Sequence, residues 1–261
     1  MDPVALSADA AASWHASWLT ALGLRSERRS AVWRALDLPP FIYWTAITLG
    51  PEASEADVVD AQRTVCDAWS SLDLSAHGFE SRDRDGREDT AHEPWFVRPP
   101  GKLAVEPLPP ELEIVRVSTP AEVTEFEAVS VHGFAGEGTP FEAGSLHPPG
   151  VLADERMTML TGRVDGRPVA AATSYRTDVA IGIYGVTTVA SARGRGYASA
   201  LTRTLIDPAL PTSLSPSPEA ESLYRRLGFE QIGALRQWNR AHPAATSGSI
   251  EGTSPQSSSS R

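Results

Sequence analysis

The feature that most constrains the fold of this chain is a basic, glycine-rich turn, Arg193–Ala198, set between an apolar strand and a helix. Upstream, residues 179–189 are apolar, β-branched and aromatic, which is typical of a buried strand. Downstream, apolar spacing predicts a helix from Tyr197 that ends at Asp207-Pro208, because proline cannot continue it. The turn therefore joins the end of a buried strand to the first turn of a helix.

This turn has the composition of an anion site. Gly194 and Gly196 carry no Cβ, so a ligand can come close to the backbone there. Amides 194–198 at a helix N-terminus lack partners and lie at the positive end of the helix dipole, while Arg193 and Arg195 add charge. The turn does not complete either the P-loop or the dinucleotide fingerprint. On these residues alone, a phosphate site and a plain solvated turn both stay open.

Composition excludes several classes of protein. The chain has 261 residues and a net charge of −10, which argues against nucleic acid as a partner. Its single cysteine, Cys66, excludes an intramolecular disulfide and a cysteine-rich zinc site, and we interpret it as a core residue. The first residues contain neither a basic region nor a long apolar run, so we expect no signal peptide, no membrane partner and a cytoplasmic location.

The chain divides into four regions. Residues 1–100 form an N-terminal α+β region, with helices expected at 10–24 and 54–72 and a buried strand at 41–49. Residues 101–110 are a proline-rich linker. Residues 111–240 form a second domain. Residues 241–261 are rich in Ser, Gly, Pro and Thr and are expected to be a disordered tail.

Strands and helices alternate regularly in residues 111–240. Thr119-Pro-Ala-Glu122 is a capping box that opens a helix, and Asp165-Gly166 predicts a hairpin. Ser217-Pro218 opens the last helix. The predicted order is a strand at 112–117, a helix from 120, strands at 157–164, 168–175 and 179–189, a helix from 197, a strand at 212–215, a helix from 218, and a strand or strand pair at 229–238.

With this order and two motifs, residues 111–240 resemble the GNAT family of N-acetyltransferases. The first motif is Arg193-Gly-Arg-Gly-Tyr-Ala198, which is similar to the family's acetyl-CoA signature Arg/Gln-x-x-Gly-x-Gly/Ala. The second is Leu223-Tyr-Arg-Arg-Leu-Gly-Phe229, which is similar to the family's Leu-Tyr-x-x-Leu-Gly-Phe. The resemblance implies an α+β fold with a GNAT-like mixed, mostly antiparallel central sheet flanked by helices, and the N-terminal α+β region as an addition to it.

The resemblance also implies a co-substrate, acetyl-CoA, and no metal. Strand residues would bind the pantetheine arm, and the turn would bind the pyrophosphate. Tyr224 would be catalytic, protonating the departing CoA thiolate. The residues that would bind acetyl-CoA are Val186, Thr187, Thr188, Arg193, Gly194, Arg195, Gly196, Tyr197, Ala198 and Ser217.

Two positions depart from the family pattern. Ser217 stands where family members often have Asn, and it is also suited to be a plain helix N-cap. The strand at 179–189 contains no Glu to act as a base through water. A water chain could serve instead, or one of four side chains in or beside the loop at 133–150, although the sequence favours a solvated loop residue at each of them: His132, Glu137, Glu142 and His147.

The expected function is acetyl transfer from acetyl-CoA to a primary amine, on a small molecule or a peptide, by direct transfer in a ternary complex. The alternative is a non-catalytic acyl-CoA-binding regulatory module, which could be a homodimer. The N-terminal region is either a degenerate second GNAT-like unit or an unrelated α+β cap. The first option depends on Gly78-Phe79 and Pro94-Trp95-Phe96, which resemble the end of such a unit.

Overall fold

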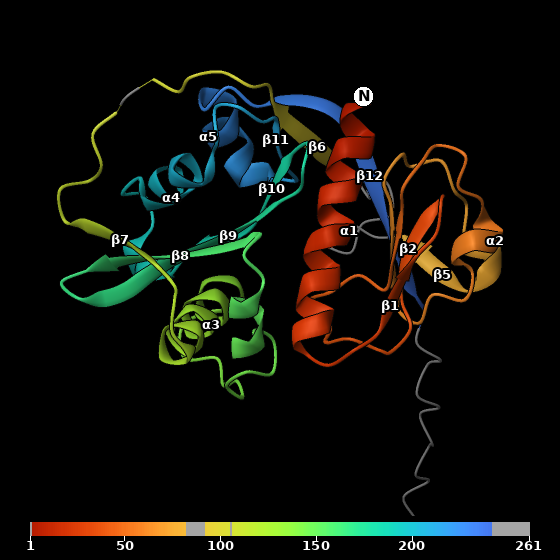
Figure 1. Cartoon of the computed structure of the whole chain (residues 1–261), viewed down its shortest axis with the longest axis horizontal. Coiled ribbons are helices and arrows are strands. Elements are labelled where there is room, and N and C mark those ends of the chain that lie inside the picture. Colours follow the sequence, from red (N-terminus) through yellow and green to blue (C-terminus); the bar gives the residue numbers. More distant parts are fainter. Residues whose placement is uncertain (1, 82–91, 105, 242–261) are drawn as a thin grey trace, which may run out of the picture.

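A computed structural model describes residues 2–81, 92–104 and 106–241 (Figure 1). Residues 242–261 of the predicted tail lie outside the described residues. Within the described part, twelve strands form one sheet in the order β1-β2-β3-β4-β12-β6-β11-β10-β9-β8-β7, with β5 paired to β12. The sheet is mixed and largely antiparallel, with helices on its faces, so the predicted α+β class is confirmed. None of the described helices has the length and apolar character to cross a bilayer.

The N-terminal half begins with a long helix and continues with short strands. The helix α1 starts at Pro3 because Asp2 caps it, accepting a hydrogen bond from the Val4 backbone N–H at 3.0 Å. The elements are α1 Pro3–Ala21, β1 Ser26–Arg28, β2 Val32–Ala35, β3 Ala46–Thr48, α2 Glu55–Val58, β4 Thr64–Asp67, the 3₁₀ helix η1 Ser75–His77, β5 Phe79–Ser81 and β6 His92–Arg98.

The helix predicted at 54–72 is wrong. The structure has only the single turn α2 there, followed by β4 Thr64–Asp67. All four residues of β4 are buried, and a short run buried on both faces cannot be told from a buried helix by its spacing. Cys66 lies on this strand and is fully buried, as expected of a core residue, and burial raises the pKa of its thiol.

The C-terminal half shows the predicted order of strands and helices. The final strand is a single long one, β12. The elements are β7 Leu112–Arg116, α3 Pro120–Ala135, η2 Pro149–Ala153, β8 Met157–Val164, β9 Arg167–Arg176, β10 Ile181–Thr188, η3 Ala190–Ala192, α4 Tyr197–Leu205, β11 Thr212–Leu214, η4 Pro218–Ala220, α5 Glu221–Arg226 and β12 Glu230–Arg240.

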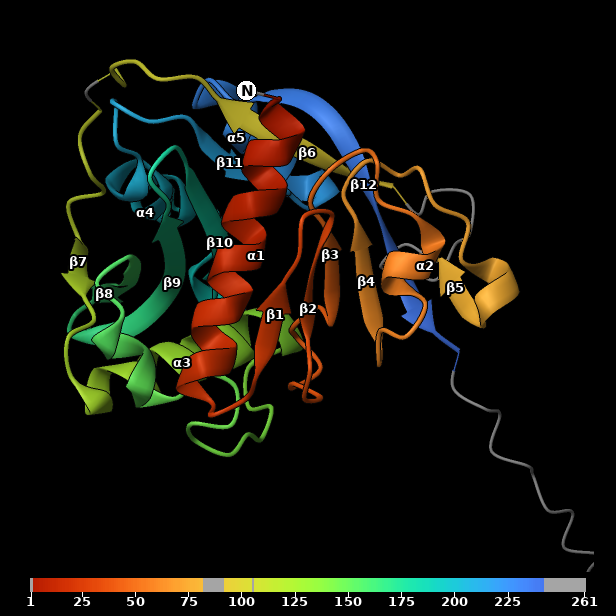
Figure 2. The same ribbon diagram turned by 45° about the vertical axis from the view of Figure 1, so that its right-hand side comes forward.

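The two halves of the chain share the sheet. Strand β6, which precedes the predicted linker, lies between β11 and β12 and pairs antiparallel with both. Strand β12 then pairs with β4 on its other side, so the sheet runs unbroken from β7 to β1 (Figure 2). The predicted boundaries at residues 100 and 110 therefore fall in the segment that leads from β6 to β7.

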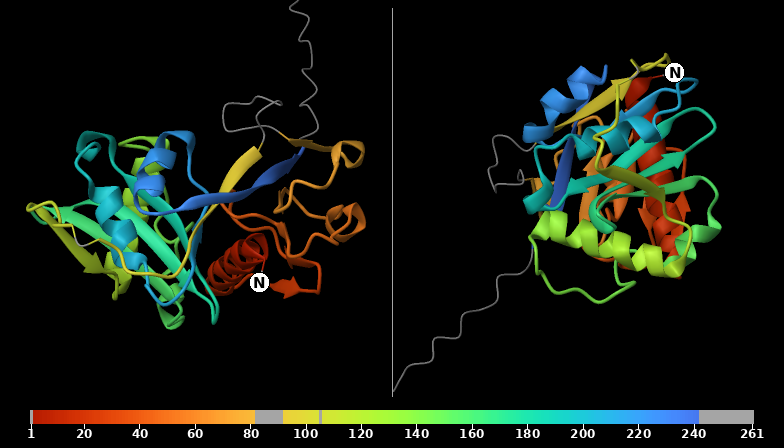
Figure 3. Two further views of the ribbon diagram at one scale, coloured as in Figure 1. Left: turned by 90° about the horizontal axis from the view of Figure 1, so that it is seen from above. Right: turned by 90° about the vertical axis from the view of Figure 1, so that its left-hand side faces the viewer.

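Helix α1 stands between the two groups of strands (Figures 1 and 3). It packs against β9, β10 and β11 on one side and against β1, β2 and β3 on the other. Helices α3 and α4 lie on opposite faces of β8–β10 (Figure 1). The N-terminal half thus covers strand β10 on the face where α3 also packs.

Candidate active site

Strand β10 runs past the end of its parallel neighbour. Among the described residues β11 pairs with β10 only at Ile181 and Gly182, and its last residue, Leu214, pairs with Phe96 of β6. The edge of β10 from Ile183 to Thr188 therefore has no partner from β11. Val186, Thr187 and Thr188 lie on this edge, where the sequence predicts the pantetheine arm.

A bulge bends β10 at this point. Its register with β9 shifts between Tyr184 and Thr187, and Gly185 there has φ +62°, a conformation that favours glycine. The Thr173 hydroxyl donates to the Tyr184 carbonyl oxygen at 3.1 Å and holds the bulged segment. Helix α3 packs closely on the same segment, because a Cβ at Gly133 would collide with Thr187 Oγ1.

The glycine-rich turn ends at the N-terminus of α4. Gly194 and Gly196 have φ +77° and +82°, and Gly196 is the N-cap, with no side chain to cap the helix. Residues 193–196 are exposed. The N–H groups of the first helical turn have no intrahelical acceptor and carry the positive end of the dipole. This arrangement can bind an anion through the backbone.

The two arginines of the turn differ in their surroundings. Arg193 donates from Nε to the Thr188 carbonyl oxygen at 3.1 Å and from Nη2 to the Gly133 carbonyl oxygen at 2.8 Å. It therefore joins the ends of β10 and α3. Arg195 instead lines two pockets.

Tyr197 anchors the segment that leads into β7. Its ring is buried, and its hydroxyl donates to Glu111 Oε1 at 2.7 Å. This hydrogen bond raises the pKa of Tyr197 and lowers the pKa of Glu111. Tyr197, the first residue of α4, therefore holds the segment before β7 against this helix.

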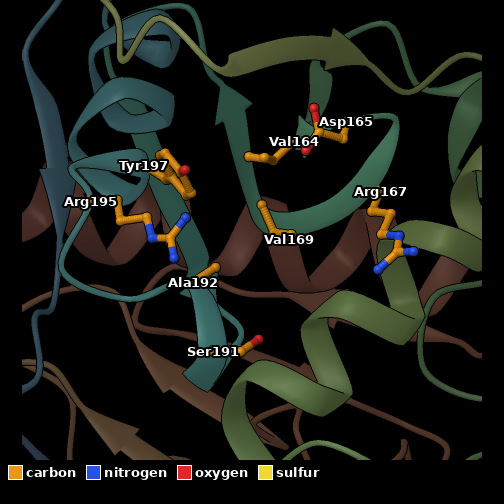
Figure 4. Close-up of a pocket in the computed structure, with 8 residues that line it drawn as sticks. All are labelled: Val164, Asp165, Arg167, Val169, Ser191, Ala192, Arg195 and Tyr197. Carbon is orange, nitrogen blue, oxygen red and sulfur yellow. The ribbon is translucent and has the colours of Figure 1, made fainter.

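Arg195 contributes to two pockets. We call the first, of about 420 Å³, the hairpin pocket; it lies at the β8–β9 hairpin (Figure 4). It is lined by Val164, Asp165, Arg167, Val169, Ser191, Ala192, Arg195 and Tyr197. We call the second, of about 510 Å³, the connector pocket; it lies between residues 106–111 and the outer side of α4.

Tyr224 lies on α5 and is 6% exposed. Burial raises its pKa to about 12, and a hydrogen bond with Thr202 opposes part of that rise. Its ring meets Phe229 edge-on, with 5.7 Å between centroids. The phenol is therefore protonated at neutral pH. Ser217 precedes η4 and makes no side-chain cap bond, so its hydroxyl is not used to start the helix.

The four base candidates have different environments. Glu137 accepts from the Ser191 hydroxyl at 2.6 Å, which lowers the pKa of this carboxyl, and Glu142 is exposed. His132 is half-buried with its ring edge-on to Phe141. His147 is 5% exposed, and burial lowers its pKa to about 4. The structure therefore separates His147 in the core from His132 on α3 and from Glu137 and Glu142 in the loop, which lie nearer the surface.

Sequence reasoning missed Glu127, which shapes this loop. Its side chain is fully buried on α3 and accepts backbone N–H bonds from Gly144 at 2.5 Å, Leu146 at 2.8 Å and His147 at 2.9 Å. The sequence signal that could have identified Glu127 is its position four residues after Val123, on the apolar face of the helix. A charged residue on that face is rarely buried without partners.

A family model matches the part of the chain that carries the candidate site. Residues 130–229 match the model of the Acetyltransferase (GNAT) family, and they form a GNAT acetyltransferase domain. No curated protein matches the chain significantly.

Solved structures share the fold over most of the chain. A GCN5-related N-acetyltransferase from Kribbella flavida is 19% identical with a TM-score of 0.58, covering 89% of this chain and 96% of that one. A GNAT-family protein from Novosphingobium aromaticivorans is 17% identical with a TM-score of 0.54, covering 87% and 97%. A functionally unknown conserved protein from Staphylococcus epidermidis is 14% identical with a TM-score of 0.51, covering 82% and 92%. The likeness extends over the N-terminal half as well; the degenerate second unit stays a prediction.

Proposed function

We propose that this protein transfers an acetyl group from acetyl-CoA to a primary amine by direct transfer in a ternary complex. The observation that carries the proposal is the free edge of β10, Ile183–Thr188, leading to the amide-rich turn at the start of α4. A strand edge offers N–H and C=O groups to the amides of a pantetheine arm. The turn offers N–H groups and Arg195 to a pyrophosphate.

The residues around this edge support the proposal by fixing the strand and by leaving the turn's backbone open. Arg193 is bonded to the ends of β10 and α3, so it holds the strand and the turn in fixed positions. Gly194 and Gly196 place no side chain over the backbone of the turn at their own positions. Acetyl-CoA would supply an activated thioester, and the protein would orient it beside the acceptor.

In the proposed reaction the amine nitrogen bonds to the carbonyl carbon and the carbon–sulfur bond breaks. Tyr224 remains protonated at neutral pH because its pKa is about 12. Its hydroxyl can therefore donate a proton to the departing sulfur. The nitrogen loses its proton through water or a carboxylate of the loop, for which Glu142 is free of the bond that engages Glu137. The balance is one acetyl group gained by nitrogen and one thiol released, and the proton lost by nitrogen returns through solvent to Tyr224, which gave its own to sulfur.

We propose that the amine that accepts the acetyl group is positively charged. The chain carries a net charge of −10, which raises the encounter rate of a positively charged substrate. We place the reaction in the cytoplasm, which agrees with a single, buried, unpaired cysteine.

Calorimetric titration of the full chain with acetyl-CoA tests the proposal. We expect saturable binding at one site per chain, followed by release of free CoA thiol when a panel of primary amines is added. Absence of acetyl-CoA binding would refute the function. Binding without thiol release from any amine would instead support a non-catalytic acyl-CoA-binding module.

A further inference from the structure

A carboxylate and a hydroxyl meet just beyond the end of strand β11. Ser215, the residue that follows β11, donates from its hydroxyl to Glu93 Oε2 at 3.4 Å. Glu93 belongs to β6, the strand that pairs between β11 and β12. Both side chains are half-buried. The strand that precedes the predicted linker therefore brings a negative charge to the end of β11, beside which the edge of β10 becomes free.

Glu93 lies on the face of the sheet that helix α1 covers. Side chains alternate between the two faces along a strand, and residues opposed across paired strands share a face. Val97 opposes Ser213, so Glu93, four residues before Val97, lies on the same face as Ser213. Ser213 also pairs with Gly182 of β10. The Tyr184 ring lies over Gly182, because a Cβ there would collide with the Tyr184 hydroxyl, and it packs against α1. Glu93, Ser213 and Tyr184 therefore lie on one face.

Two hydroxyls on this face are buried and make no hydrogen bond with any described residue. They are Oγ of Ser213, a residue that is 2% exposed, and the phenol oxygen of Tyr184. A buried hydroxyl without a partner costs free energy, so such atoms point to a polar ligand or water beside them. We define the polar row as these two residues together with the pair at the end of β11: Tyr184, Ser213, Ser215 and Glu93. The row begins on β10 and ends on β6.

The polar row separates Glu93 from the proposed reaction centre. Neighbouring strands lie about 4.8 Å apart, and β11 stands between β10 and β6, so β10 and β6 are about 10 Å apart. The proposed function places the thioester along the free edge of β10. A hydrogen bond spans only about 3 Å, so the position of Glu93 favours contact with another part of the acceptor than the attacking nitrogen.

We infer that Glu93 binds a second positive charge on the acceptor, which is therefore a diamine. The inference rests on the proposed function, which puts the reacting nitrogen at the edge of β10. That nitrogen is uncharged when it attacks, so an ion pair that lasts through the reaction needs another ammonium group further along the acceptor. A half-buried carboxylate attracts a cation more strongly than an exposed one such as Glu142, because less water screens it. Glu93 is then a specificity-determining residue and takes no part in the proton transfer.

The test compares 1,5-diaminopentane with pentylamine, which has the same carbon chain and lacks the second charge. Initial rates of CoA thiol release from acetyl-CoA give kcat and KM for each amine on the full chain. We expect the native KM to be about tenfold lower for the diamine, and Glu93→Gln to remove this difference by raising the diamine KM about tenfold. The kcat with either amine should stay within about twofold of the native value. Glu93→Asp keeps the charge and should retain part of the preference.

Glu113→Gln is the matched control. Glu113 is an exposed glutamate on β7, at the far edge of the sheet, and its replacement changes the net charge by the same amount. This variant should leave both KM values unchanged, which separates a contact at Glu93 from a general effect of charge on encounter. Calorimetry should show that Glu93→Gln binds acetyl-CoA as the native chain does.

Four results would overturn the inference while the proposed function stands. The native chain uses both amines equally well, or Glu93→Gln raises both KM values by the same factor. Alternatively, Glu93→Gln lowers kcat with both amines at unchanged KM, which would make Glu93 the base, or it loses acetyl-CoA binding, which would make Glu93 a structural residue. If the native chain binds no acetyl-CoA, or releases no thiol with any amine, the proposed function fails and the inference fails with it.

Discussion

Trp14 donates a hydrogen bond from Nε1 to Thr173 Oγ1 at 3.1 Å, joining the first helix of the chain to strand β9. Thr173 in turn donates to the Tyr184 carbonyl oxygen, in the bulged part of β10. The rings of Trp14 and Tyr184 also pack, with 4.7 Å between centroids. The N-terminal half thus contacts the strand that forms the candidate site.

Replacing Trp14 with Phe should therefore destabilise the protein. The change keeps an aromatic ring but removes the donor to Thr173, and we expect a loss of about 1–3 kcal/mol in the free energy of unfolding, measured by urea denaturation. Trp69→Phe is the control, because Trp69 donates to Asp2 at an exposed position, and it should cost less than about 0.5 kcal/mol. Equal losses in the two variants would contradict a specific role for the Trp14 contact.

Local signals predicted the C-terminal half well. The capping box of α3 is present, with the Glu122 carboxylate accepting from the Thr119 N–H at 3.0 Å and the Thr119 hydroxyl accepting from the Glu122 N–H at 3.3 Å. Asp165, with φ +50°, and Gly166 form the hairpin turn. Such features depend on residues a few positions apart, so their chemistry is visible in the sequence.

The contacts that the sequence did not predict join residues that are far apart in the chain. Nothing near β6 in the sequence shows that His92–Arg98 pairs between β11 and β12. Likewise, the carbonyl oxygens that engage Arg193 belong to Thr188 and to Gly133, 60 positions away. Strand pairing and such hydrogen bonds follow from tertiary packing, which overrides local preference.

The different surroundings of Arg193 and Arg195 predict different effects on substitution. Arg193→Gln should lower the free energy of unfolding by about 1–2 kcal/mol, because it removes donors to two carbonyl oxygens that join β10 to α3. Arg195→Gln should leave stability within about 0.5 kcal/mol of the native value. On the proposed function it should weaken acetyl-CoA binding about tenfold, as measured by calorimetry. The reverse pattern would show that Arg193, rather than Arg195, contacts the ligand.

Glu127 should be more important for stability than its neighbour Glu125. Glu127→Gln puts an amide group where three backbone N–H groups need an acceptor, so we expect a loss of about 2–4 kcal/mol in thermal or urea unfolding. Glu125 pairs with Arg163 at the surface, and Glu125→Gln should cost about 0–1 kcal/mol. A native-like Glu127→Gln variant would mean that the 144–147 loop does not depend on this carboxylate.

Two buried histidines should make the protein less stable in acid. Burial lowers the pKa of both His15 and His147 from 6.5 to about 4, so the folded state keeps them neutral. Between pH 6.5 and 4 the unfolded chain binds protons at these residues and the folded chain does not. The free energy of unfolding therefore does not depend on these two histidines above pH 6.5. It decreases as the pH falls from 6.5 towards 4, by about 3 kcal/mol for each histidine.

The free energy of unfolding, measured by urea denaturation at several pH values between 4 and 6.5, gives the slope of stability against pH. His147→Leu should reduce the slope by about half, since one of the two groups is gone. His77→Gln is the control, because His77 lies in an exposed pair with Glu55, and it should leave the slope nearly unchanged. A slope that is insensitive to His147→Leu would assign the acid sensitivity to other groups.

Tyr224→Phe separates chemistry from binding in the proposed reaction. The variant keeps the ring against Phe229 but removes the hydroxyl, so kcat should fall about a hundredfold while the KM for acetyl-CoA changes little. Tyr175→Phe is a matched control: Tyr175 is also buried, and its pKa is likewise raised to about 12, chiefly by burial, but it lies on β9 opposite Gly182. It should retain most of the native kcat.

The pH profile adds a second check on Tyr224. Because its pKa is about 12, the phenol stays protonated up to pH 10, and kcat should show no decline from its ionisation below that value. A decline near pH 8 in the native enzyme that disappears in Tyr224→Phe would mean that the bound co-substrate lowers this pKa. A variant with native kcat would exclude Tyr224 as the acid and leave water as the donor to the departing sulfur.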